Sequence, residues 1–187
     1  MTTIADLRGY PGGETLRAAA GWVMGTDGHS AACIRADAPP DARDGVPALE
    51  ALAVVEPALT TTADALTAWC GPPCADCGDS GWIGVACPKC HGTRRRTCVC
   101  PDCGDEHTLD CGCDGTSETP CPHPRRLLRI AGFVVDVAVL RRPLPYLRGA
   151  VTVAVVMVGN VLQLRDEHDT VGLVVRYVGE ATEEWAG

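Results

Sequence analysis

The distribution of cysteines constrains this chain more than any other feature. Twelve cysteines occur among 187 residues, and eleven of them fall between Cys70 and Cys121, so that only Cys33 lies outside that segment. Cysteines spread evenly along the chain would suggest a secreted disulfide scaffold, whereas this clustering defines a local module. From Cys70 to His123 the segment has few apolar residues, and burial alone cannot fold such a segment.

The module contains four close cysteine pairs. They are Cys74 and Cys77, Cys87 and Cys90, Cys100 and Cys103, and Cys111 and Cys113. A two-residue spacer brings both sulfurs onto one metal ion at about 2.3 Å, and backbone N–H groups of the turn can donate to them. Because eight thiolates make two tetrahedral sites, we expect these cysteines to bind two structural Zn²⁺ ions. Zinc supplies about 10–16 kcal/mol in small fingers, which would replace the absent core.

The pairing of these cysteines is left open by an internal duplication. The pattern Cys-x-x-Cys-Gly-Asp at residues 74–79 recurs at residues 100–105. Either each repeat closes its own site, or the outer pairs share one ion and the inner pairs the other. The other thiols of the segment, Cys70, Cys98 and Cys121, are substitute ligands or inert, and its histidines, His91, His107 and His123, are alternative ligands or loop residues.

Residues 74–117 resemble the cysteine-rich zinc domain of the DnaJ-type co-chaperones, which has four Cys-x-x-Cys-x-Gly-x-Gly repeats with nested pairing. The repeat Cys87-Pro-Lys-Cys90-His-Gly92 follows that motif as far as its first glycine. The resemblance implies one zinc ion on Cys74, Cys77, Cys111 and Cys113 and the other on Cys87, Cys90, Cys100 and Cys103. No J-domain signature is present, since His123-Pro124 is followed by Arg125 where that family has aspartate, so stimulation of an ATPase is not implied.

The two flanks predict strands and short helices. We expect a hairpin over residues 21–35 that turns at 26–29, a helix broken near Pro57 over 47–69, a strand over 127–135, a short helix capped by Asp136, a hairpin of 151–158 with 161–165, and a strand over 171–178. Each flank is too small to be stable as an independent domain. We therefore predict an α+β fold, in which residues 1–69 and 124–187 form one sheet-plus-helix domain and residues 70–123 are an inserted, loop-rich two-zinc module.

A second resemblance concerns the first predicted hairpin. The run Val23-Met24-Gly25-Thr26-Asp27-Gly28-His29 resembles the Thr-Asp-Gly-His segment of bacterial DNA sliding clamps, and the elements after Arg129 are similar in style to one clamp domain. This resemblance implies a clamp-like body. A chain of 187 residues is too short for a full clamp protomer, so processivity does not follow.

The composition of the metal sites argues against catalysis. All-cysteine zinc sites are closed, whereas a catalytic zinc keeps an open position. A nucleic-acid deaminase needs His-x-Glu, but His29 is followed by Ser30 and Ala31. A thioredoxin-like pair would begin a helix in a βαβ unit, and these pairs lie in turn-rich segments. We expect a non-enzymatic zinc-binding adaptor whose module binds a protein partner through apolar residues such as Trp82.

The distribution of charge supports one alternative. Arg94, Arg95 and Arg96 and the basic stretch from Arg125 to Arg148 would suit a nucleic-acid-associated, clamp-like zinc-finger factor, although the net charge of -8 argues against general phosphate binding. No apolar run approaches the roughly 20 residues of a membrane span, and the first thirty residues lack a signal-peptide pattern. We therefore expect a cytoplasmic protein without membrane partners.

Overall fold

The computed structural model divides the chain into two compact units. The first unit comprises Met1–Gly71 and Arg125–Gly187, and the second comprises Pro72–Pro124. The residues that the structure describes are 2–11, 15–46, 49–91, 93–99, 106–114, 116–123, 125–156 and 160–185. The first unit, called the body below, contains segments from both ends of the chain, and the second, called the module, contains the cysteine pairs.

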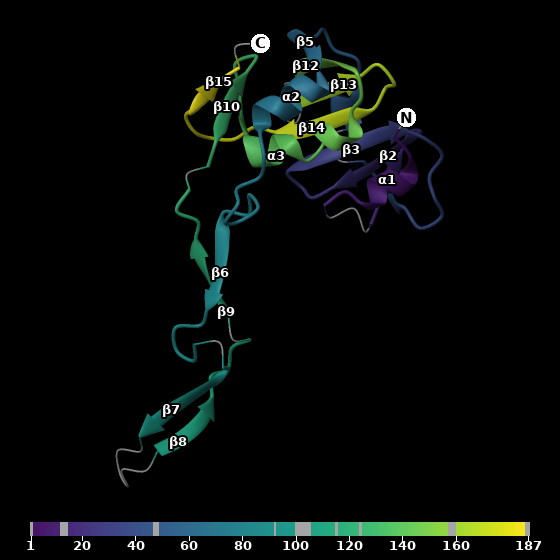
Figure 1. Ribbon diagram of the computed structural model, residues 1–187. Helices are drawn as coiled ribbons and strands as arrows, with labels where there is room; N and C mark the ends of the chain where they lie inside the picture. Colours follow the sequence, from purple (N-terminus) through teal and green to yellow (C-terminus); the bar gives the residue numbers. More distant parts are fainter. Residues whose placement is uncertain are drawn as a thin grey trace. The chain divides into compact units, whose positions relative to one another are not determined.

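The body is built on an eight-stranded sheet to which both ends of the chain contribute (Figure 1). In spatial order its strands are β4 (Arg43–Asp44), β1 (Arg17–Ala19), β2 (Trp22–Thr26), β3 (Ser30–Arg35), β14 (Val171–Val175), β13 (Val161–Asp166), β12 (Ala150–Val156) and β5 (Leu59–Thr62). The two ends meet where β3 pairs antiparallel with β14, with Cys33 opposite Val171. Strands therefore dominate this mixed fold.

Both predicted hairpins of the body are confirmed. Strands β2 and β3 pair antiparallel with Met24 opposite Cys33, and the turn between them is held by Asp27, whose Oδ1 accepts the backbone N–H groups of His29 at 2.9 Å and Ser30 at 2.8 Å. Strands β12 and β13 pair antiparallel as well. Residues 157–159, which the prediction placed at the end of the first strand and in its turn, lie outside the described residues.

The predicted helix over residues 47–69 is wrong for most of its length. A 3₁₀ turn, η1 (Leu49–Leu52), is followed by strand β5, and only α2 (Ala63–Cys70) is α-helical. The reason is the run Thr60-Thr61-Thr62, whose β-branched side chains favour an extended edge strand against β12. Residues 47 and 48 lie outside the described residues.

The predicted strand over residues 127–135 is two strands. Strand β10 (Leu127–Ile130) turns at Ala131 and Gly132, both with positive φ, into β11 (Phe133–Asp136). A third strand, β15 (Glu183–Glu184), completes this sheet. The predicted cap is confirmed, because Asp136 Oδ1 accepts the N–H of Ala138 at 2.8 Å at the start of α3 (Val137–Arg141).

Two further short helical segments of the body are α1 (Ile4–Arg8) and η2 (Leu144–Tyr146). The hydrophobic core of the body lies on both faces of the large sheet. One face packs against α2 and α3, through residues such as Leu66 and Leu140, and the other packs against η1 through Leu52. Among the helices of the described ranges, none is long and apolar enough to span a membrane.

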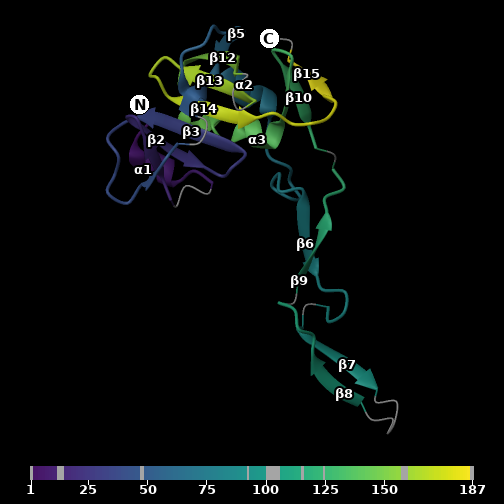
Figure 2. The ribbon, with the colours of Figure 1, turned by 180° about the vertical axis from the view of Figure 1, so that it is seen from behind.

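The module consists of two antiparallel ribbons. Strands β6 (Trp82–Ala86) and β9 (Thr116–Pro120) pair with Trp82 opposite Pro120. Strands β7 (Arg95–Val99) and β8 (Glu106–Asp110) pair with Arg95 opposite Asp110. Within each ribbon the two strands run side by side in both views of the chain (Figure 2). Within the module the chain therefore passes through β6 and then β7, and returns through β8 and β9.

Candidate metal centre

The ends of the ribbons bring separate cysteine pairs together. Cys87 and Cys90 lie in the connection from β6 to β7, and Cys111 and Cys113 lie in the returning connection from β8 to β9. The N–H of Cys111 donates to the carbonyl of Arg94 at 2.8 Å, which continues the β7–β8 pairing up to the cysteines. The two connections therefore face each other where the ribbons adjoin.

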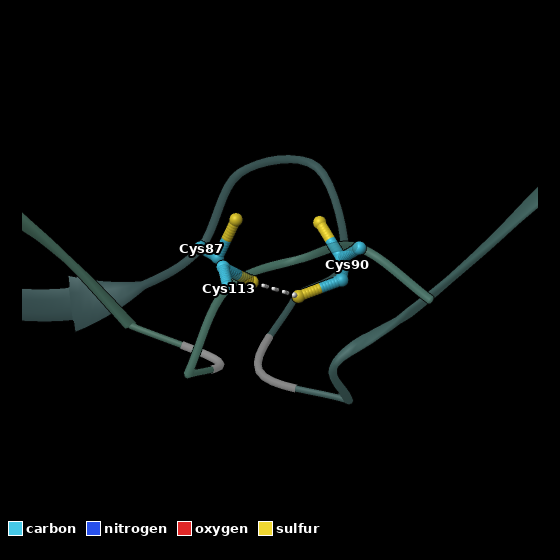
Figure 3. Close-up of side chains that lie close together, drawn as sticks. Cys87, Cys90 and Cys113 are labelled. Atoms are coloured by element: carbon cyan, nitrogen blue, oxygen red, sulfur yellow. Dashed lines mark hydrogen bonds between the residues drawn. The ribbon is translucent and has the colours of Figure 1, made fainter. Parts of the chain in front are cut away.

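These four cysteines form the first of two candidate metal sites, the four-cysteine site. The sulfurs of Cys87, Cys90, Cys111 and Cys113 all lie within 4.8 Å of one another. Figure 3 labels Cys87, Cys90 and Cys113, and its dashed line joins the sulfurs of Cys90 and Cys113. These two sulfurs are 3.5 Å apart. In a zinc tetrahedron with Zn–S bonds of about 2.3 Å, two sulfurs are ~3.8 Å apart. The spacing of this group is therefore close to that of a tetrahedral sulfur site.

The electrostatics of the four-cysteine site favour a bound cation. Backbone N–H groups of Lys89 and then Cys90 stabilise the thiolate of Cys87 and lower its pKa to about 7. The neighbouring thiol of Cys113 contributes most to raising the pKa of Cys111, which reaches about 12. One sulfur is thus ready to ionise, while the thiol of Cys111 keeps its proton because it hydrogen-bonds to the neighbouring sulfur of Cys113. A cation bound among the four sulfurs would replace that proton and favour the thiolate form.

The second candidate site, the three-cysteine site, lies at the other end of the β6–β9 ribbon. The sulfurs of Cys74, Cys77 and Cys121 lie within 4.8 Å of one another. Cys121 is held there by its N–H, which donates to the carbonyl of Gly81 at 2.9 Å. The N–H of Gly81 is the main cause of the lowered pKa of Cys77. This site therefore has the same donor chemistry as the first, with a turn on one side and the end of a strand on the other.

The N–H of His123 lowers the pKa of Cys121, but this effect is outweighed by burial and by the thiols of Cys77 and Cys74, so that the pKa rises to about 11. A cation at the three-cysteine site would remove this penalty, as in the four-cysteine site.

The observed grouping corrects the pairing implied by the DnaJ-type resemblance. Cys111 and Cys113 lie with Cys87 and Cys90, and not with Cys74 and Cys77. The reason is the β6–β9 ribbon, which places Cys74 and Cys77 beside Cys121. The sequence predicts Cys121 as a substitute ligand or an inert thiol, and not as one of the eight ligands. Cys100 and Cys103, predicted as ligands, lie outside the described residues, as does the side chain of Cys98.

The pattern of burial sets the module apart from the body. In the part of residues 72–124 that the structure describes, the only buried side chains are those of Cys87 and Cys90. Trp82 and Leu109 are 49% and 44% exposed. None of the three hydrophobic core clusters found among the described residues includes a residue of the module. The module therefore has buried sulfur where a domain normally has buried hydrocarbon.

The remaining thiols of the body are core side chains. Cys33 and Cys70 are completely buried in separate hydrophobic clusters. Burial raises the pKa of both thiols, that of Cys70 to about 11. None of the nine cysteines whose side chains the structure describes forms a disulfide, and Cys33 and Cys70 stay protonated at neutral pH.

Most arginines of the predicted basic stretch already contact acidic groups. The ion pairs are Arg125 with Asp136 at 3.6 Å, Arg126 with Glu183 at 2.7 Å, Arg129 with Glu184 at 3.9 Å, and Arg142 with Asp27. In the module, Arg94 Nε donates to the carbonyl of Asp114 at 2.7 Å. The four ion pairs reduce the free positive charge that phosphates would need, whereas the bond of Arg94 to a neutral carbonyl leaves its charge in place.

Comparison with known proteins adds no family assignment. No protein-family model matches the chain, and no curated protein matches it either.

Proposed function

We propose that this protein is a non-enzymatic zinc-binding adaptor, in which two zinc ions order the module and the ordered module binds a protein partner. The observation that carries the proposal is that sulfur supplies the only buried side chains in the described part of the module. Thiolate ligands suit zinc, and zinc binding commonly drives the folding of segments that lack a core.

The proposed absence of catalysis follows from the composition of the four-cysteine site. Four thiolates fill a tetrahedral zinc ion and leave no position for a substrate or an activated water. The ion would therefore act as a structural crosslink between the outgoing connection at Cys87 and the returning connection at Cys111.

The proposed contact surface is the β6–β9 ribbon. Trp82 is half exposed there, and tryptophan is enriched among the residues that dominate protein interfaces. Each strand of this two-stranded ribbon also has one edge unpaired within the described sheets, and such an edge can accept a strand from a partner. The paired arginines of the body favour this protein-binding function over phosphate binding.

The test is capture of partners from a lysate of the source organism by the zinc-loaded chain, at increasing salt. We expect a protein to be retained with little salt dependence, and Trp82→Ala to reduce its retention at least about tenfold, as loss of a central interface tryptophan does. Val178→Ala is the matched control, because Val178 is a 92% exposed apolar side chain of the body. Steeply salt-dependent retention of nucleic acid instead would contradict the adaptor function.

A further inference from the structure

Among the residues that the structure describes, the three-cysteine site brings together three sulfurs, one ligand fewer than a tetrahedral zinc ion takes. Cys74, Cys77 and Cys121 supply three sulfurs, and the cysteines of the four-cysteine site are already grouped with one another. Structural zinc sites are almost always four-coordinate, with Cys₄, Cys₃His and Cys₂His₂ as the common ligand sets. If this site holds zinc, as proposed above, a fourth donor is required.

The imidazole of His123 stands where that donor is needed. Its Nδ1 lies 3.4 Å from the sulfur of Cys74 and 3.6 Å from the sulfur of Cys121, and these two sulfurs are 3.8 Å apart. In a tetrahedron with the usual zinc bond lengths, a sulfur and a nitrogen are ~3.6 Å apart and two sulfurs ~3.8 Å. The three measured separations therefore match one face of a Cys₃His tetrahedron.

We propose that His123 Nδ1 is the fourth ligand, so that the module carries one Cys₃His site and one Cys₄ site. The inference rests on the zinc-binding function proposed above. Because only Pro122 separates Cys121 from His123, the segment that follows β9 can supply two ligands, as the turn with Cys74 and Cys77 does on the other side of the site. The group within 4.8 Å contains only the sulfurs, so the 60% exposed imidazole closes the site by rotating toward Cys77.

Asp76 is the competing donor. Its Oδ2 lies 3.4 Å from the same nitrogen of His123. No described contact joins the carboxylate of Asp76 to the sulfur of Cys74 or Cys121, whereas His123 Nδ1 contacts both sulfurs. Zinc sites that hold thiolates use imidazole as the common partner ligand. Once Nδ1 binds the ion, the ring proton stays on Nε2, which fixes the tautomer of His123.

The two sites then differ in charge and in proton release. Zinc on three thiolates and one neutral imidazole carries a net charge of -1, and it displaces up to three thiol protons. Zinc on four thiolates carries -2 and displaces up to four. Binding to the site of His123 therefore depends less steeply on pH than binding to the site of Cys87.

The test is the ¹⁵N spectrum of the histidine rings in the full, zinc-loaded chain, together with zinc counting by native mass spectrometry. We expect one histidine locked as the Nε2–H tautomer, a signal that His123→Gln removes and His91→Gln, the control beside the other site, retains. His123→Gln should lower the affinity for one of the two zinc ions at least about 100-fold, because loss of a residue that only hydrogen-bonds to a ligand already lowers metal affinity 10–100-fold. His123→Cys should restore tight binding of two ions.

Two results would overturn the inference while leaving the zinc-binding function intact. One is two tightly bound ions in His123→Gln. The other is loss of an ion in Asp76→Asn with no change in His123→Gln. If the wild-type chain binds no zinc at all, the proposed function fails first, so the two failures are distinguishable.

Discussion

Replacement of Cys87 with serine tests the structural role of zinc most directly. Cys87 is 6% exposed, and its thiolate is stabilised by two backbone N–H groups. A serine hydroxyl accepts the same hydrogen bonds but keeps its proton at neutral pH, and oxygen is a poorer partner than sulfur for zinc in a thiolate site. We expect Cys87→Ser to empty the four-cysteine site and to unfold the β7–β8 ribbon.

The size of the effect follows from what else holds the module together. Ile83 and Val85 are only half-buried, and since complete burial of such a side chain contributes about 1.5–3 kcal/mol, the two together contribute about 1.5–3 kcal/mol. A structural zinc ion contributes about 10–16 kcal/mol in small fingers. An isolated two-stranded ribbon is marginally stable at best, so the remaining contacts cannot replace the lost ion.

Hydrogen exchange and native mass spectrometry give the readout. In Cys87→Ser we expect the zinc count to fall from two to one, and backbone amides of β7 and β8 to lose their protection while those of β3 and β14 keep theirs. The control is Cys33→Ala, which alters a completely buried cysteine of the body and should keep both ions. Retention of both ions in Cys87→Ser, or unchanged protection of β7 and β8 after complete chelation, would refute the reasoning.

Two further predictions concern the body. Asp27→Asn removes a carboxylate that pairs with Arg142; burial raises the pKa of this carboxyl, but the N–H groups of His29 and Ser30, followed by Arg142, outweigh burial and lower it. The variant should lose about 1.5–3 kcal/mol of unfolding free energy at pH 7 in urea titrations. A carboxyl with a lowered pKa contributes its full stabilisation above the unfolded value of about 3.9 and loses it as the pH falls through the lower folded value, so the deficit should shrink below about pH 4. Asp37→Asn, which changes an exposed carboxylate, should show neither effect. A deficit unchanged at pH 2 would contradict the reasoning. Replacing residues 72–124 with a four-residue Gly-Ser linker should leave the body folded, because the residues beside the two ends of the deletion are already in contact where Arg126 Nη1 donates to the carbonyl of Cys70 at 2.8 Å. The shorter loop should raise the free energy of unfolding by no more than about 2 kcal/mol. Loss of the cooperative thermal transition in that deletion, measured by circular dichroism, would show that the body depends on the module.

The parts of the fold that sequence predicts well are those with strong local signals. The Asp27-Gly28 turn and the cap at Asp136 each use a side chain that bonds its own backbone, so that a few residues suffice. Strand β5 was missed because its partner, β12, lies about ninety residues further along the chain. Pairing with a distant strand decided between helix and strand there, and local composition does not report such pairing.

At the metal sites, too, local sequence predicts which residues are ligands, whereas the pairing of distant strands decides how they group. Nine residues separate Cys77 from Cys87, and nine separate Cys90 from Cys100, whereas seven separate Cys103 from Cys111, and seven separate Cys113 from Cys121. Outgoing arms of nine residues and returning arms of seven can therefore pair in two ways, which differ by a shift of one cysteine pair.

One of these arrangements leaves Cys121 spare, and the other gives Cys74 and Cys77 a partner at Cys121, as the structure has it. Spacing thus predicts that the chain folds back on itself with sulfurs at the ends of its ribbons. The choice between the two arrangements depends on which strands pair. The pairing that decides it is that of β6 with β9, where Trp82 lies opposite Pro120, and neither strand contains a cysteine. The sequence signal that favours the observed shift is Cys121, a thiol that only this arrangement brings into a group of sulfurs.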